Sequence, residues 1–134
     1  MERSFKRNLA ALDDVFAFLD EALAAYNVDA ASAYAVNFAV EEFFTNMVKY
    51  EPEGDHTVSI NLNRLANQLT VRMIDTGVQP FDVTNARAPD LSASLEDRRV
   101  GGLGIHISRE LLDSVTYDHE KGKSTITFVK TLET

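Results

Sequence analysis

The chain has 134 residues, of which 45% are hydrophobic and 25% charged, a balance typical of one folded domain rather than of a disordered segment. Its formal net charge of -8 disfavours direct binding to nucleic acid, which needs clustered Lys and Arg. The absence of Cys excludes disulfides and thiolate metal sites. Residues 1–7 lack the apolar run of a signal peptide, and no segment approaches the roughly 20 apolar residues of a membrane span. We therefore expect a cytoplasmic protein without a membrane segment.

The first half of the chain contains two helical patterns. Residues 5–9 are expected to form a short strand, after which apolar side chains recur at helical spacing over residues 12–26. A second helix is predicted to begin near residues 29–32 and to end before Pro52 and Gly54. The apolar stripe of this second helix consists of Val36, Val40, Phe43 and Met47.

The second half of the chain alternates between strand, loop and helix patterns. Apolar residues alternate with polar ones over residues 58–62 and 69–73, which predicts a hairpin with its turn at residues 63–67. Residues 78–100 have no period and predict a long loop of the kind that often covers a ligand. A third helix is predicted from the apolar residues Leu103, Ile107 and Leu111, and two closing strands are predicted on either side of residues 121–122.

These elements predict an α+β fold. We expect a two-layer α/β sandwich in which three helices cover one face of a mixed, mostly antiparallel sheet. The opposite face of the sheet should be partly solvated.

Four of the six glycines fall at two places. Gly77 follows a predicted strand and lets the backbone turn sharply behind Asp75. Gly101, Gly102 and Gly104 precede the third helix, where bare amides and the helix dipole favour an anion such as phosphate. Two ordinary turns would explain the same glycines.

The second helix also carries a polar stripe. Glu42, Asn46 and Lys49 are spaced i, i+4 and i+7, so they share a face. If this face borders a cleft, Asn46 can offer a carbonyl oxygen to Mg²⁺ and Glu42 can act as a general base. The alternative is a solvated flank of a helix packed on the core.

In chain order these three elements resemble the N, G1 and G2 boxes of the histidine-kinase-like (Bergerat) ATPases. The boxes are Glu42 to Asn46 on a helix, the strand end Asp75-Thr76-Gly77, and Gly101 to Gly104 at the start of a helix. The resemblance covers nearly the whole chain. Within the superfamily, three segments are similar to the RsbW-type anti-sigma-factor serine kinases: residues 39–46, 80–82 and 127–130.

The resemblance implies a role for each matching residue. Glu42 matches the general base and Asn46 the Mg²⁺ ligand, while Glu41 lacks the position one helical turn before Asn46. Asp75 matches the aspartate that accepts a hydrogen bond from the adenine amino group, and Gly77 gives the base room to approach. The residues implied at the phosphates are Gly101, Gly102, Leu103 and Gly104.

Three further positions bear on the site. Arg99, beside Arg98 in the lid that the resemblance places at about residues 78–104, can neutralise charge on the γ-phosphate or remain a solvated loop residue. Lys49, counted with the ATP-binding residues, stands where many relatives have a histidine, and Ser124 stands where many have an asparagine. The three histidines, His56, His106 and His119, lack metal-ligand spacing and are expected on the surface or in strands.

The resemblance implies a single ATPase domain, residues 1–134, that uses ATP and Mg²⁺ as a serine/threonine protein kinase. Its implied partners are a STAS-type anti-anti-sigma protein, which it phosphorylates, and a sigma factor, which it sequesters, and the family often forms homodimers. The alternative is a nucleotide-binding regulatory module without phosphotransfer, although such a module has no need of Glu42. A third alternative is a histidine-kinase catalytic domain or a gyrase-type ATPase. We expect no room in this chain for the additional segments of those proteins.

Overall fold

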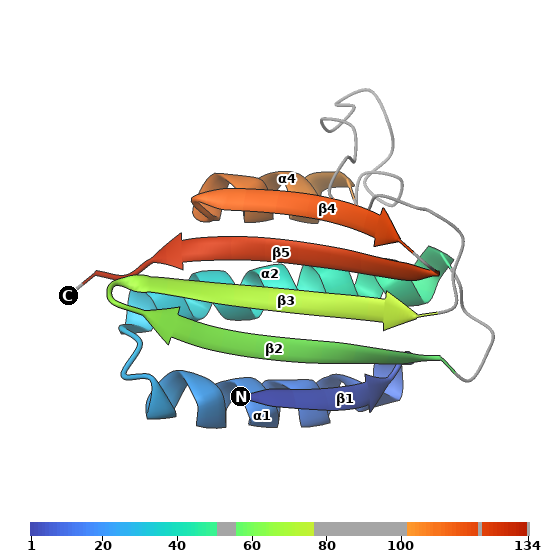
Figure 1. Ribbon diagram of the computed structural model, residues 1–134, viewed down its shortest axis with the longest axis horizontal. Coiled ribbons are helices and arrows are strands. Elements are labelled where there is room, and N and C mark those ends of the chain that lie inside the picture. The colour runs from blue at the N-terminus through green and yellow to red at the C-terminus, as the bar shows by residue number, and fades with distance from the viewer. Residues whose placement is uncertain (51–55, 77–101, 121, 134) are drawn as a thin grey trace.

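The computed structural model describes residues 1–50, 56–76, 102–120 and 122–133. These residues form two layers, with the helices packed on one face of a sheet (Figure 1). The strands are β1 (Glu2–Lys6), β2 (Thr57–Leu65), β3 (Gln68–Thr76), β4 (Ser114–Glu120) and β5 (Lys123–Thr131). The helices are a short 3-10 helix η1 (Leu9–Ala11), α1 (Leu12–Ala25), α2 (Ala30–Tyr50) and α4 (Gly102–Leu111).

The five described strands form one sheet with the order β1-β2-β3-β5-β4. Each neighbouring pair among them is antiparallel, so the predicted α+β sandwich is confirmed and its described part has no parallel pair. The last strand, β5, lies between β3 and β4. The register places Asp75 of β3 between Val58 of β2 and Ser124 of β5.

The core lies between the two layers. Side chains that alternate along the strands are buried against α1 and α2, and the rings of Phe43 and Phe128 join α2 to β5 with centroids 5.9 Å apart. The predicted apolar stripe of α2 is buried along its whole length. The core includes Val15, Phe18, Leu19, Val36, Val40, Phe43, Val58, Ile60, Leu69, Val71, Met73, Ile126 and Phe128.

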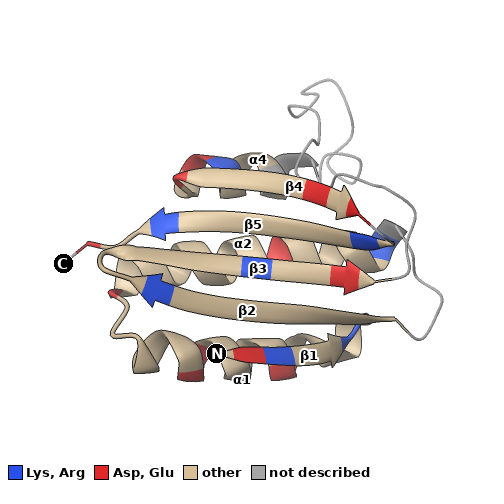
Figure 2. Ribbon diagram, in the orientation of Figure 1, with Lys and Arg blue, Asp and Glu red and all other residues tan. Residues whose placement is uncertain are grey.

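The other face of the sheet is predominantly polar, as the alternating burial of its strands requires. Figure 2 shows Lys and Arg dispersed over several strands and helices instead of gathered in one tract. None of the described helices is both long and apolar enough to cross a bilayer.

The first strand differs from its prediction. It occupies Glu2–Lys6 instead of residues 5–9, and Leu9 already belongs to η1. The cause is Asn8, whose side chain accepts a hydrogen bond from the Ala11 backbone amide and so caps η1. Because β1 is an edge strand with mostly exposed side chains, its sequence carries little periodicity.

The hairpin also differs from the sequence interpretation. The β2–β3 strands extend further than predicted and are joined by Ala66 and Asn67 alone, with Ala66 at a φ of 54°. The predicted third helix is present as α4, in which Ile107 is 36% exposed and Ser108 is buried, as is Leu112 just after the helix.

Candidate nucleotide site

Several strands and helices begin or end at one end of the molecule. The ends of β1, β3 and α2 and the beginnings of β5 and α4 all lie on the right in Figure 1. The polar residues predicted for the site come from these elements. They form two groups, one around Glu42 and one around Asp75.

The first group joins α2 to α4. A Cβ built on Gly104 would lie 1.9 Å from Oε2 and 2.2 Å from Cδ of Glu42, so the Glu42 carboxylate lies directly against Gly104. The helix begins at Gly102, which places the glycines 102 and 104 inside its first turn and not in a loop before it. The amides of a first helical turn have no partner within the helix and favour an anion.

Glu42 is a half-buried carboxylate with perturbed acidity. Its burial raises the pKa of the carboxyl above its ordinary value, the charge of the exposed neighbour Glu41 raises the pKa further, and Lys49 lowers it. Glu42 thus combines the contact with α4 and a raised pKa. A raised pKa makes a carboxylate a stronger base.

Asn46 lies one turn after Glu42 and is 2% exposed. Its Nδ2 donates a hydrogen bond to the backbone carbonyl of Glu42 at 2.6 Å, which fixes the orientation of the amide. That hydrogen bond uses Nδ2, so Oδ1 is the side-chain atom that could coordinate a cation. This arrangement fits an Mg²⁺ ion, because Mg²⁺ takes few protein oxygens and completes its shell with phosphates and water. No three His, Cys, Asp or Glu side chains among the described residues form an alternative metal cluster.

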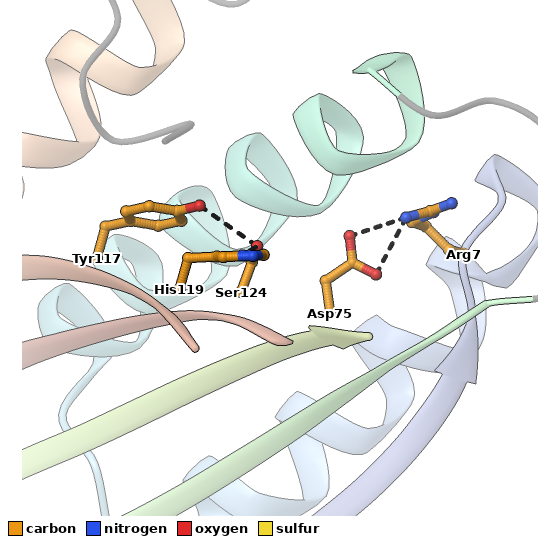
Figure 3. A network of polar contacts seen from close by, with 5 residues as sticks. All are labelled: Arg7, Asp75, Tyr117, His119 and Ser124. Carbon is orange, nitrogen blue, oxygen red and sulfur yellow. Dashed lines mark hydrogen bonds and ion pairs between the residues drawn. The ribbon is translucent and has the colours of Figure 1, made fainter. Parts of the chain in front are cut away.

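The second group surrounds Asp75 at the end of β3. Its carboxylate accepts hydrogen bonds from Nη1 of Arg7, which lies 3.1 Å from Oδ1 and 2.9 Å from Oδ2 (Figure 3). The side chains of Arg7 and Asp75 are only 1% and 6% exposed, so the ion pair is buried. The sequence interpretation did not include Arg7 in the site.

A hydroxyl and imidazole cluster lies on the other side of Asp75. Ser124, opposite Asp75 in the register, has its Oγ 3.3 Å from the hydroxyl of Tyr117 and 3.0 Å from Nδ1 of His119 (Figure 3). His119 is half-buried in β4, in agreement with the expectation of a strand position. Tyr117 and His119 were not predicted near the site, because only strand pairing brings them to Ser124.

The structure describes some of the remaining predicted positions and not others. Lys49 is exposed on α2, one turn beyond Asn46. Leu103 lies in the first turn of α4, between the two glycines. Gly77, Arg98, Arg99 and Gly101, with the rest of the expected lid up to residue 101, lie outside the described residues.

A model of the histidine kinase-like ATPase domain matches residues 5–130. The chain belongs to this family. The match includes both groups of polar residues, and it confirms the family that the three boxes indicated.

The relatives that the chain resembles are named as protein kinases or as an anti-sigma factor. The chain is 31% identical over 97 residues to the anti-sigma F factor of Clostridium beijerinckii, an alignment that covers 71% of this chain and 67% of that protein. It is 30% identical over 97 residues to the serine-protein kinase RsbW of Listeria monocytogenes, covering 68% of this chain and 61% of that protein. The serine/threonine-protein kinase BtrW of Bordetella bronchiseptica is 24% identical over 96 residues, covering 70% of this chain and 67% of that kinase.

A solved structure of this family has the same fold. The structure of the RsbU and RsbW domains of a Mycobacterium tuberculosis protein superposes with a TM-score of 0.66 and 20% sequence identity. The superposition covers 98% of this chain and 31% of that longer chain. The likeness to that structure therefore concerns the arrangement of helices and sheet.

Proposed function

We propose that the protein is an ATP-dependent serine/threonine protein kinase and anti-sigma factor of the bacterial cytoplasm. In this proposal it phosphorylates a STAS-type anti-anti-sigma partner and sequesters a sigma factor. The observation that carries the proposal is the contact of the Glu42 carboxylate with the first turn of α4, with Asn46 buried one turn away. The names of the relatives support the same function.

Each residue has a distinct task in the proposed reaction. Asp75 accepts a hydrogen bond from the adenine amino group, and the backbone amides of Gly102 and Gly104 bind phosphate oxygens. Asn46 would hold Mg²⁺ through Oδ1, and that ion neutralises charge on the phosphates. We also assign Gly77, Lys49, Arg99, Gly101 and Leu103 to nucleotide binding, as their positions in the boxes and the lid suggest.

The proposed chemical step transfers the γ-phosphoryl group to a hydroxyl of the partner. The hydroxyl oxygen forms a bond to the γ-phosphorus, the bond from that phosphorus to the β–γ bridging oxygen breaks, and ADP leaves. Glu42 takes the hydroxyl proton, for which its raised pKa suits it. Because phosphoryl transfer requires little covalent chemistry from the protein, positioning of the two substrates provides most of the catalysis.

The adjacent glutamates provide a matched test of this step. We expect label from γ-labelled Mg·ATP to appear on serine or threonine of a STAS partner with the wild type and with Glu41→Gln. In Glu42→Gln the transfer rate should fall about 10²- to 10⁴-fold while ATP binding persists. Equal rates in the two variants would contradict the role of Glu42. Binding of ATP without label on any partner would favour a regulatory module that acts by occupancy alone.

A further inference from the structure

Arg7 lies beside Asp75, at the end of the molecule that holds the candidate site, although it belongs to none of the three boxes. It follows β1, and its backbone amide donates to the carbonyl of His56 at 3.1 Å, which continues the β1–β2 ladder by one residue. Asn8 then caps η1. The Arg7 backbone is thus fixed on both sides, and its side chain has a set direction toward Asp75.

The contact between the two side chains involves one donor and both carboxylate oxygens. A single nitrogen, Nη1, contacts both oxygens of Asp75 and so occupies the sector between them. An ionised carboxylate has about four lone-pair directions, so one donor does not exhaust its capacity to accept. The ion pair therefore does not by itself exclude an amino group of a ligand from the same carboxylate.

The charge of Arg7 also decides what the carboxylate can recognise. A buried carboxyl without a cation tends to become protonated, whereas an adjacent guanidinium favours the ionised form. An ionised carboxylate only accepts hydrogen bonds, but a protonated carboxyl also donates. Adenine presents an amino group at its position 6, where guanine presents a carbonyl oxygen, so only the ionised form distinguishes the two bases.

We propose that Arg7 is a positioning and specificity-determining residue, which orients the Asp75 carboxylate and keeps it an acceptor, so that the site binds ATP and rejects GTP. The inference rests on the proposed adenine-binding role of Asp75. It adds a residue 68 positions away in the sequence that acts through Asp75 without touching the nucleotide. Charge-assisted hydrogen bonds in a buried site are strong enough for such discrimination.

The test compares the dissociation constants of Mg·ATP and Mg·GTP by calorimetry for four forms of the chain. Arg7→Gln keeps hydrogen-bond donors but removes the charge, and Arg7→Lys keeps the charge. Arg3→Gln removes the same charge from β1, four residues before Arg7, where Arg3 pairs with exposed Glu21 at 3.9 Å. It is therefore the control for a general loss of charge. The wild type is the fourth form.

We expect Arg7→Gln to weaken ATP binding about tenfold and to lower the preference for ATP over GTP at least about fivefold. Arg7→Lys should stay within about fivefold of the wild-type preference, because it retains the cation, and Arg3→Gln should match the wild type. A folded Arg7→Gln variant with unchanged preference would overturn the inference. Tighter ATP binding by that variant would also overturn it, because Arg7 would then compete with adenine.

The outcomes separate this inference from the proposed function. A wild type that binds neither nucleotide refutes the proposed ATP site itself. A wild type that prefers ATP, with a preference insensitive to Arg7, refutes only the role of Arg7. Removal of one partner of a buried ion pair is destabilising, so circular dichroism must accompany each measurement. If Arg7→Gln does not fold, Arg7→Lys decides, and a preference more than about fivefold below wild type contradicts the proposal.

Discussion

The Glu42 carboxylate receives opposing influences from two neighbours on the same helix. The negative charge of Glu41 raises its pKa, and the positive charge of Lys49 lowers it, while burial makes the largest contribution upward. Since a base must be ionised to accept a proton, phosphotransfer should rise with pH through this raised pKa. The acidic limb of the pH–rate profile, over which the transfer rate rises, should therefore lie at a pH above the ordinary pKa range of a glutamate.

Substitution of the two neighbours should move that limb in opposite directions. Glu41→Gln removes a repulsive charge and should shift the limb to lower pH, whereas Lys49→Gln should shift it to higher pH. The measurement is the single-turnover rate of label transfer between about pH 5 and pH 9. A common direction for both variants would contradict the electrostatic account. The protonated carboxyl also favours folding, and this contribution is lost as pH rises through the raised pKa.

Gly104 permits a test in which activity and stability separate. In Gly104→Ala the new methyl group would overlap Oε2 of Glu42, which is the flexible end of a side chain and can move aside. We expect at least about a tenfold loss of transfer rate with a melting temperature near that of the wild type, since Ala favours a helix by about 1 kcal/mol over Gly. In a Glu42→Gln background the same change should have little further effect on rate. A large loss of stability would show that α4 moves instead.

The pair of Glu42 and Asn46 could be predicted from the sequence, whereas the pair of Arg7 and Asp75 could not. Glu42 and Asn46 are separated by one helical turn, so local spacing suffices to place them together. Arg7 and Asp75 meet only because β1 pairs with β2 and β2 with β3. No local pattern records that register, and a lone arginine after an edge strand has no distinguishing signal.

Among the elements, α2 begins with a cap that depends on ionisation. Oδ2 of Asp29 accepts a hydrogen bond from the Ser32 amide at 2.9 Å, and Oδ1 accepts one from the Glu133 amide at 3.0 Å. The hydrogen bond from the Ser32 backbone is the main cause that lowers the pKa of Asp29. The cap therefore stabilises α2 at pH values above the unfolded pKa, and this contribution is lost as pH falls through the lowered folded pKa.

We expect Asp29→Ala to lower the melting temperature at pH 7, with a difference from wild type that shrinks in acid. Asp29→Asn is the matched control, because asparagine caps helices as well as aspartate does but does not titrate. Its melting temperature should stay close to wild type at neutral pH. Thermal melts followed by circular dichroism measure all three forms. A gap between Asp29→Ala and wild type that widens in acid would contradict the assignment.

Element prediction succeeded where burial imposes a strong period and failed where it does not. The α2 stripe was correct because every residue in it is buried. In α4 the inward face includes Ser108, whose Oγ donates to the Gly104 carbonyl at 2.9 Å. A small polar residue that bonds its own helix can be buried without an apolar signal, so apolar spacing does not identify Ser108 as a buried residue.

For the molecule as a whole, the fold class followed from the order of patterns along the chain. Two amphipathic helices, a hairpin, a third helix and two closing strands leave few ways to cover one face of a sheet. The position of β5 between β3 and β4 is not contained in those patterns, because hydrophobic alternation does not identify a strand's neighbours. The sequence therefore predicted Asp75 at the site but not which residues lie opposite it in the sheet.

The strand order has a consequence for synthesis on the ribosome. β5 follows β4 in the chain, yet it pairs with both β3 and β4. A nascent chain that ends at Glu120 has both of those strands but lacks their shared neighbour, and exposed strand edges of this kind promote association with other chains. When β5 emerges, it joins the two parts of the sheet and brings Ser124 to Asp75. Completion of the sheet and assembly of the residues around Asp75 are thus one event in the life of each new chain.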